Sequence, residues 1–204
     1  LDRSSAASDV YKRQVGEIQN EKAGHLNLGV EGTMAMGACA GFMVAYKTGS
    51  LWLSILAAFL MGALVSLIYA FLTITMMANQ NVTGLTLTIF GTGLSNFIGE
   101  QMISASPTGN LKLPDGVMSS LKNIDIPLLS KIPVLGEVLF SQNIFTYLSI
   151  VIAVIMFIYL KKTKVGLNLR TIGENPAVAD AVGISVVKYK YINVLIGGGI
   201  CGIG

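Results

Sequence analysis

The sequence predicts an all-α integral membrane protein with about five visible transmembrane helices. Only 12% of its 204 residues are charged and 52% are hydrophobic, with a mean hydropathy of +0.66. Soluble domains carry about 25% charged residues, so half that share indicates that lipid is the solvent. Several apolar runs approach the roughly 20 residues that a helix needs to cross a bilayer.

The two ends of the chain differ from its interior. Residues 1–14, LDRSSAASDVYKRQ, are polar and stop abruptly before the rest of the sequence. They are predicted to be a non-native adapter or vector read-through, which leaves residues 15–204 as a partial transmembrane domain. Because the last residues, GGGICGIG, lie inside an apolar run, the chain is expected to be truncated at both ends.

The predicted spans differ in strength. Residues 144–160 are the clearest, because eleven of them are Leu, Ile, Phe or Val, which together contribute roughly −3 to −7 kcal/mol of insertion free energy. Residues 51–77 are amply long, whereas residues 82–103 contain Thr, Ser, Asn and Gly among their apolar side chains. In chain order the expected spans are 30–46, 51–77, 82–103, 144–160 and 191–204, the last cut off by the end of the chain.

The charges of the two longest loops predict the orientation of these spans. Residues 161–190 contain six basic and two acidic side chains, whereas residues 104–142 contain three of each. Positively charged loops stay on the cytoplasmic side of a membrane. We therefore expect 161–190 to be a cytoplasmic loop and 104–142 to be an extracytoplasmic loop, which its prolines and apolar patches make an ordered cap.

The inventory of reactive side chains predicts neither a catalytic residue nor a metal site. His25 is the only histidine, and Cys39 and Cys201 lie far apart without ligand spacing. The chain has no phosphate-binding G-x-x-x-x-G-K-[ST] stretch. A net charge of +3 without a basic run among aromatic residues gives no reason to expect nucleic-acid binding.

A glycine motif near the end has two interpretations. Gly197, Gly199 and Gly202 form G-x-G-x-x-G after an apolar run, as in dinucleotide-binding folds. The same glycines, with the Gly198 and Gly202 pair at four-residue spacing, would let transmembrane helices pack closely. The other apparent spans favour helix packing over a dinucleotide site.

Polar side chains recur along the third predicted span. Thr88, Thr92 and either Ser95 or Asn96 share one helical face, and Asn27 and Glu31 lie in a glycine-rich stretch around the start of the first span. Such groups must face protein or water, because unsatisfied polar groups in lipid cost several kcal/mol each. They either line a solute path or form hydrogen bonds between helices, and the sequence leaves both possibilities open.

The segment GLNLRTIGENPAVADAVGIS contains dense helix signals inside the predicted cytoplasmic loop. Asn175 suits an N-cap, Pro176 suits the first turn, and Gly183 suits the position after the last turn. This pattern predicts a short helix lying on the membrane surface. It is either a docking element for a partner or an ordinary amphipathic connector.

Three stretches in order resemble the permease subunits of bacterial ABC importers. They are AGHLNLGVEGTMAMGA, ANQNVTGLTLTIFGTGLS and TKVGLNLRTIGENPAVADAVGISV. The resemblance is to the family of branched-chain amino acid, ribose and simple-sugar permeases, and within it to the nucleoside and simple-sugar branch that a lipoprotein receptor feeds. It covers the sequence after residue 15, although complete members carry more spans.

The resemblance implies a permease fragment of the bacterial inner (plasma) membrane, with a cytoplasmic coupling helix and no enzyme activity. A separate ABC ATPase would bind ATP and Mg²⁺, a second permease subunit would complete the path, and an extracytoplasmic binding lipoprotein would deliver a nucleoside or simple sugar. Asn27, Glu31, Thr88, Thr92 and Asn96 would belong to the substrate path. The expected ATPase-coupling residues are Arg170, Gly173, Glu174, Asn175, Pro176, Ala179 and Gly183.

Other functions stay open beside this one. An ion-coupled secondary transporter would want paired charges inside the membrane, and only Glu31 and Glu100 are candidates. A permease of the same family could carry branched-chain amino acids instead. A membrane oxidoreductase could use the glycine motif if an acidic residue followed about 20 positions after it.

Overall fold

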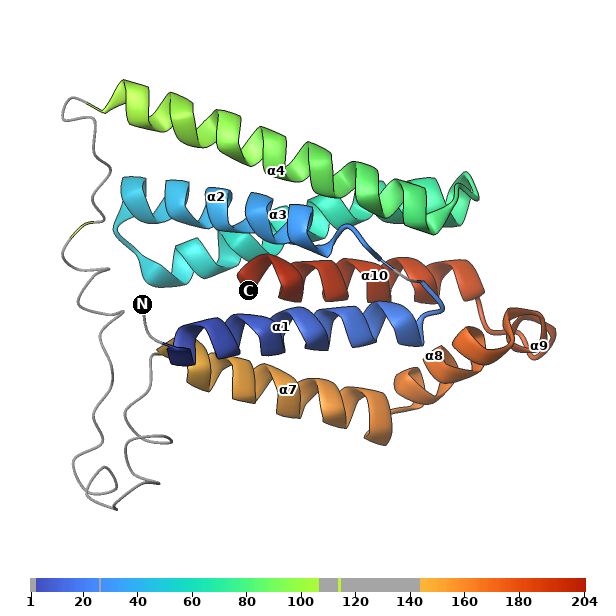
Figure 1. Cartoon of the computed structure of the whole chain (residues 1–204). Coiled ribbons are helices and arrows are strands. Elements are labelled where there is room, and N and C mark those ends of the chain that lie inside the picture. Colours follow the sequence, from blue (N-terminus) through green and yellow to red (C-terminus); the bar gives the residue numbers. More distant parts are fainter. Residues whose placement is uncertain (1–2, 26, 107–113, 115–143) are drawn as a thin grey trace, which may run out of the picture.

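The computed structural model describes residues 3–25, 27–106, 114 and 144–204, and within these residues it contains helices and no strand. The helices lie side by side as a bundle (Figure 1). The α2–α3 turn, the end of α4 and the start of α7 lie at one end, and α8 and α9 lie at the other (Figure 1). The elements are α1 (Arg3–Lys22), α2 (Val30–Thr48), α3 (Leu51–Ala70), η1 (Phe71–Thr75), α4 (Gln80–Ala105), α7 (Ile144–Lys162), α8 (Lys164–Glu174), α9 (Pro176–Ala181) and α10 (Val186–Ile203).

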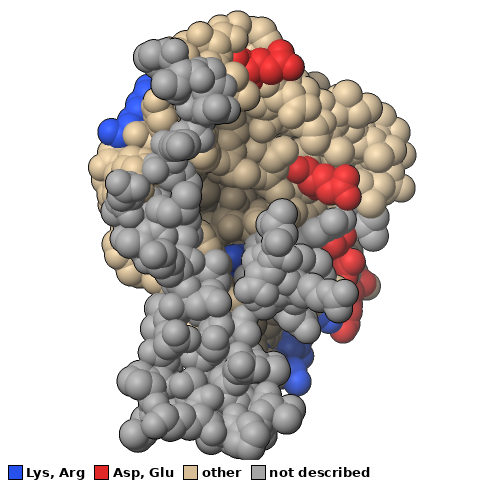
Figure 2. All heavy atoms as spheres, turned by 60° about the vertical axis from the view of Figure 1, so that its left-hand side comes forward, with Lys and Arg blue, Asp and Glu red and all other residues tan. Residues whose placement is uncertain are grey.

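Each of the five ranges expected to span a membrane contains a described helix. Two of them, Leu51–Thr75 and Ile144–Lys162, are long and apolar enough to cross a bilayer. α2, α4 and α10 occupy the other three ranges, and their crossing stays a prediction. Most of the described surface at the end that carries the α2–α3 turn is uncharged (Figure 2). The predicted extracytoplasmic loop, apart from Pro114 and the last residues of α4, lies outside the described residues.

Helix α1 was not among the expected elements. It begins inside residues 1–14, whose non-native origin stays a prediction, and it packs against α10 and α7. The sequence did not indicate this helix because its residues are mostly polar. Gln19 and Asn20 are buried by the neighbouring helices, although neither is hydrophobic. The helix ends at Lys22, and the φ of 77° at Gly24 lets the His25 amide donate to the Asn20 carbonyl at 3.0 Å.

Helix α8 is a second element that the sequence analysis did not predict. Thr163 caps it, because its hydroxyl accepts a hydrogen bond from the Gly166 amide at 3.1 Å. Leu169 and Ile172 are fully buried three residues apart, which is the spacing of one helical face. The cap and this spacing were the signals in the sequence that could have revealed the helix.

Glycines bring α2, α3 and α10 together at backbone distance. A Cβ added at Gly37 would overlap the carbonyl of Gly202, and one added at Gly62 would overlap the carbonyl of Gly198. Gly197, Gly199 and Gly202 all lie within α10 and are buried. The helix-packing interpretation of the glycine motif is therefore confirmed, and the strand and turn of a dinucleotide site are not present there.

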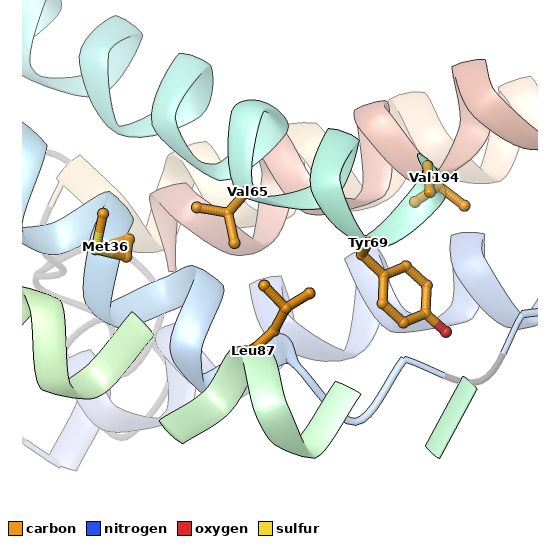
Figure 3. Close-up of a cluster of buried hydrophobic side chains, with 6 residues drawn as sticks. Met36, Val65, Tyr69, Leu87 and Val194 are labelled. Atoms are coloured by element: carbon orange, nitrogen blue, oxygen red, sulfur yellow. The ribbon is translucent and has the colours of Figure 1, made fainter. Parts of the chain in front are cut away.

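A cluster of buried apolar side chains fixes four helices to one another. Figure 3 shows Met36 from α2, Val65 and Tyr69 from α3, Leu87 from α4 and Val194 from α10. Tyr69 and Val194 have no exposed surface. The cluster lies beside the contact between α2 and α4, so the packing holds the expected polar row of α4 against α2.

Candidate functional site

The polar row of α4 forms hydrogen bonds to α2, to the residues just before α2 and to its own helix. The Thr88 hydroxyl donates to the Leu28 carbonyl at 2.9 Å, and the Ser95 hydroxyl donates to the Ala35 carbonyl at 2.9 Å. The Thr92 hydroxyl donates to the carbonyl of Thr88 at 2.7 Å. Hydrogen bonding between helices, one of the two possibilities left open, is thus what the structure shows for Ser95, whereas Thr88 bonds to the segment that leads into α2.

The five expected path residues lie in different surroundings. Asn27 is buried, and its side-chain oxygen accepts a hydrogen bond from the Gly29 amide at 2.9 Å. Glu31 and Asn96 are exposed, whereas Thr88 and Thr92 are partly buried. Asn27 precedes Leu28 in the chain, and Thr88 donates to the Leu28 carbonyl. The role of the set in a substrate path stays a prediction.

His25 lies buried in the turn between α1 and α2. Its side chain is 2% exposed, and neither ring nitrogen has a hydrogen-bond partner among the described residues. Burial, and to a smaller extent the charge of Lys190, lowers the pKa of His25 from 6.5 to about 4. The imidazole is therefore neutral at physiological pH.

The lowered pKa of His25 predicts a pH-dependent stability. A base whose pKa is lower in the folded state binds fewer protons than in the unfolded state, so its contribution is complete above pH 6.5 and is lost toward pH 4. We expect the free energy of unfolding to be lower by roughly 3 kcal/mol at pH 4 than at neutral pH because of this histidine. Thermal unfolding measured between pH 7.5 and 4 should show a smaller drop for His25→Gln than for the unchanged chain. Equal drops would contradict the assignment.

The second region is the α9 segment, whose local structure agrees with the prediction. The Asn175 side chain accepts a hydrogen bond from the Val178 amide at 3.2 Å, and Pro176 is the first helical residue. Gly183 follows the helix with a φ of 81°, a conformation that glycine adopts at no steric cost. The predicted cap, start and stop of this short helix are confirmed.

The structure sorts the expected coupling residues by exposure. Ala179 is fully buried against its own chain, so its side chain does not belong to the outer face of α9. Val178 and Val182 are 51% and 68% exposed, and sequence reasoning did not single them out. Their four-residue spacing is the signal that could have shown them on one face. Gly173, Glu174, Asn175, Pro176 and Gly183 are exposed, and Arg170 is partly buried.

The end of α8 lies directly on the end of α1. A Cβ added at Gly173 would lie 2.5 Å from the Lys22 carbonyl oxygen. Beside this contact is a polar hollow of about 370 Å³, lined by Glu21, Lys22, Arg170, Gly173 and Glu174. The segment that carries α9 therefore touches the helix bundle through backbone atoms and leaves charged groups beside the contact.

Comparison with known proteins identifies the family. Residues 17–204 match the family described as branched-chain amino acid transport system, permease component. The chain is 36% identical over 205 residues to the guanosine ABC transporter permease protein NupQ of Bacillus subtilis, and the match covers 97% of this chain and 62% of that protein. It is 34% identical over 197 residues to the putative glucose ABC transporter permease protein TsgC13 of Haloferax volcanii, covering 97% and 58%.

A third relative is the nucleoside ABC transporter permease protein NupC of Lactococcus lactis, 34% identical over 197 residues, with 93% of this chain and 60% of that protein covered. The chain thus spans about three-fifths of the length of these relatives. No solved structure matches it. The family match extends over nearly the whole chain, and these identities exceed 30%. The chain therefore belongs to the family of branched-chain amino acid transport system permease components.

Proposed function

We propose that the chain is part of the permease subunit of an ABC importer that carries a nucleoside or a simple sugar. Members of its family are membrane-integral transport subunits and not enzymes. The relatives named above are a guanosine, a nucleoside and a glucose permease. The observation that carries the proposal is the capped helix α9 with two exposed valines, Val178 within it and Val182 directly after it.

The topology that we propose follows from the loop charges. The segment from α8 to the start of α10 is cytoplasmic, so α2, α3, α4, α7 and α10 cross the bacterial inner (plasma) membrane in alternating directions. Exposed apolar side chains on α3, α4 and α7 support this placement. In the same frame α1 runs parallel to the crossing helices (Figure 1).

The proposed assembly contains the permease subunit of this chain and three other parts. A cytoplasmic ABC ATPase binds ATP and Mg²⁺ and receives α9, and its closure moves the docked helix to alternate access to the solute path. A second permease subunit, identical or homologous, completes the path. An extracytoplasmic solute-binding lipoprotein delivers the solute on the side of the α2–α3 turn.

Charging the outer face of α9 tests the docking. The double variant Val178→Glu, Val182→Glu places two carboxylates on exposed positions, so the fold should persist while an apolar contact is lost. We expect the ATPase to stop co-purifying with the permease and uptake of labelled guanosine and glucose to fall to background. Leu167→Glu is the matched control, because Leu167 is 65% exposed but lies on α8.

Three outcomes would contradict the proposal. Unchanged ATPase association in the α9 double variant would show that α9 is not the docking element, and equal loss in Leu167→Glu would move the surface to α8. Uptake that persists in cells lacking the ATPase would indicate an ion-coupled transporter instead. A competition panel that includes ribose, leucine and valine would decide the solute class.

A further inference from the structure

One buried amide joins three helices of the bundle. Asn193 on α10 has no exposed surface. Its side-chain oxygen accepts hydrogen bonds from Gln19 Nε2 of α1 at 2.5 Å and from the Tyr159 hydroxyl of α7 at 3.1 Å. Because burying a polar group without a partner is costly, these bonds favour one arrangement of α1, α7 and α10.

The same amide is connected to α8 through one neighbouring residue. Asn193 Nδ2 donates to the backbone carbonyl of Tyr189 at 2.7 Å. The Tyr189 hydroxyl accepts a hydrogen bond from Asn168 Nδ2 of α8 at 3.0 Å. Tyr189 therefore connects α8 with the interior of the bundle, because its hydroxyl is bonded to Asn168 and its backbone carbonyl to Asn193.

The end of α7 and the start of α8 are in close contact at the corner between them. A Cβ added at Gly166 would lie 2.5 Å from the Tyr159 carbonyl oxygen, and the Thr163 hydroxyl donates to that same carbonyl at 2.5 Å. A displacement of α8 is thus passed to the end of α7, where the hydroxyl of Tyr159 meets Asn193. The contacts that leave α8 through Tyr189 and those that leave it through the end of α7 therefore both reach the side chain of Asn193.

Open space lies next to these contacts. A hollow of about 460 Å³ lies between the α7–α8 corner and α10, and Tyr159, Tyr189 and Asn193 are among the residues that line it. On its other side α10 is held to α3 by the backbone contact of Gly198 with Gly62. The end of α7 therefore has room to move relative to α10, whereas α10 has little room to move relative to α3.

We propose that Tyr189 and Asn193 are positioning residues that transmit a displacement of α8 to α7 and α1, and we call this pair the α10 joint. The proposal rests on the proposed function, in which α9 receives the movement from the ATPase. The joint touches no solute. Its bonds hold one arrangement of the helices, and a shift of α8 breaks and remakes them, so that ATP hydrolysis and solute movement stay linked.

Single hydroxyl deletions test the joint with little risk to the fold. Tyr189→Phe removes the acceptor for Asn168, and Tyr159→Phe removes the donor to Asn193. In the importer reconstituted with its ATPase and binding protein, each should lower uptake of labelled guanosine or glucose per ATP hydrolysed by about five-fold or more, the low end of coupling between sites. ATPase co-purification and basal hydrolysis should stay unchanged.

A matched control and a double variant complete the experiment. Tyr191→Phe changes the same side chain on the same helix, but its hydroxyl contacts Thr75 of η1, so uptake per ATP should stay at the unchanged level. Asn168→Ala combined with Tyr189→Phe should be no worse than either alone, because both remove one link.

The proposal of the α10 joint can fail while the proposed function holds. Uptake per ATP within two-fold of the unchanged importer for both Tyr189→Phe and Tyr159→Phe would exclude it, while leaving the proposed function intact. Additive losses in the Asn168→Ala, Tyr189→Phe double variant would also exclude the link. If the unchanged importer shows no ATP-dependent uptake, the proposed function fails and the joint fails with it.

Discussion

Gly62→Val is expected to prevent the bundle from assembling. A Cβ at this position would overlap the carbonyl of Gly198 and approach the Cα of Gly202 to 2.9 Å, so neither side can yield by rotating a side chain. Overpacking a well-filled interior costs 1–3 kcal/mol and occasionally more, and a backbone clash belongs at the upper end, about 3 kcal/mol. The midpoint of thermal unfolding in detergent and the amount of protein in membranes should both fall sharply.

Gly93→Ala is the matched control for this change. Gly93 lies in α4, and a Cβ there would meet nothing within 4 Å. Because alanine is the better helix former by about 1 kcal/mol, the unfolding midpoint should stay the same or rise slightly. Similar losses for the two variants would show that α3 and α10 do not meet at their glycines.

Gly173→Val is expected to uncouple the proposed importer without unfolding it. The new side chain would push the end of α8 away from the Lys22 carbonyl, which lies 2.5 Å from the position of a Cβ. α8 would lose its support at this end and keep the one at Gly166. We expect ATP-dependent uptake to fall about ten-fold, equivalent to about 1.4 kcal/mol of coupling free energy.

The control for Gly173→Val lies in the same segment. Gly183 has a φ of 81° and open space around it, and asparagine tolerates that conformation. Because Gly183 is itself an expected coupling residue, Gly183→Asn controls for stability: its midpoint of thermal unfolding should stay near that of the unchanged chain. Normal uptake by Gly173→Val would mean that the contact between α8 and α1 plays no part in coupling. A loss of thermal stability equal to that of Gly62→Val would mean that the contact supports the fold instead.

The features that could be predicted from the sequence are those that nearby residues determine. Asn175, Pro176 and Gly183 place the cap, start and stop of α9 within a few positions of one another. Long apolar runs likewise predict α3 and α7, because insertion free energy depends on composition and length. The glycines of α10 could be assigned to helix packing because they lie within an apolar run, which is also a local feature.

The missed features depend on contacts between distant parts of the chain. Gln19 and Asn193 are 174 positions apart, and nothing local in either stretch indicates that they meet. Ala179 and Val178 are neighbours in one short helix, yet only the fold shows that one is buried and the other exposed. The polar sequence of α1 suggests a surface segment, and its burial is a consequence of α7 and α10 packing around it.

The positions of the glycines make some helices of the bundle more rigidly packed than others. α3 and α10 meet backbone to backbone, and α2 and α4 do the same where Gly32 meets the Leu87 carbonyl and Gly91 meets that of Gly32. α7 contains no glycine at all, so side chains that can change rotamer separate it from α1. α1 also meets α10 backbone to backbone, at Gly16 and Gly197. Five helices (α1, α2, α3, α4 and α10) thus form a stiff block, and compliance is concentrated at α7, the one helix that continues directly into α8.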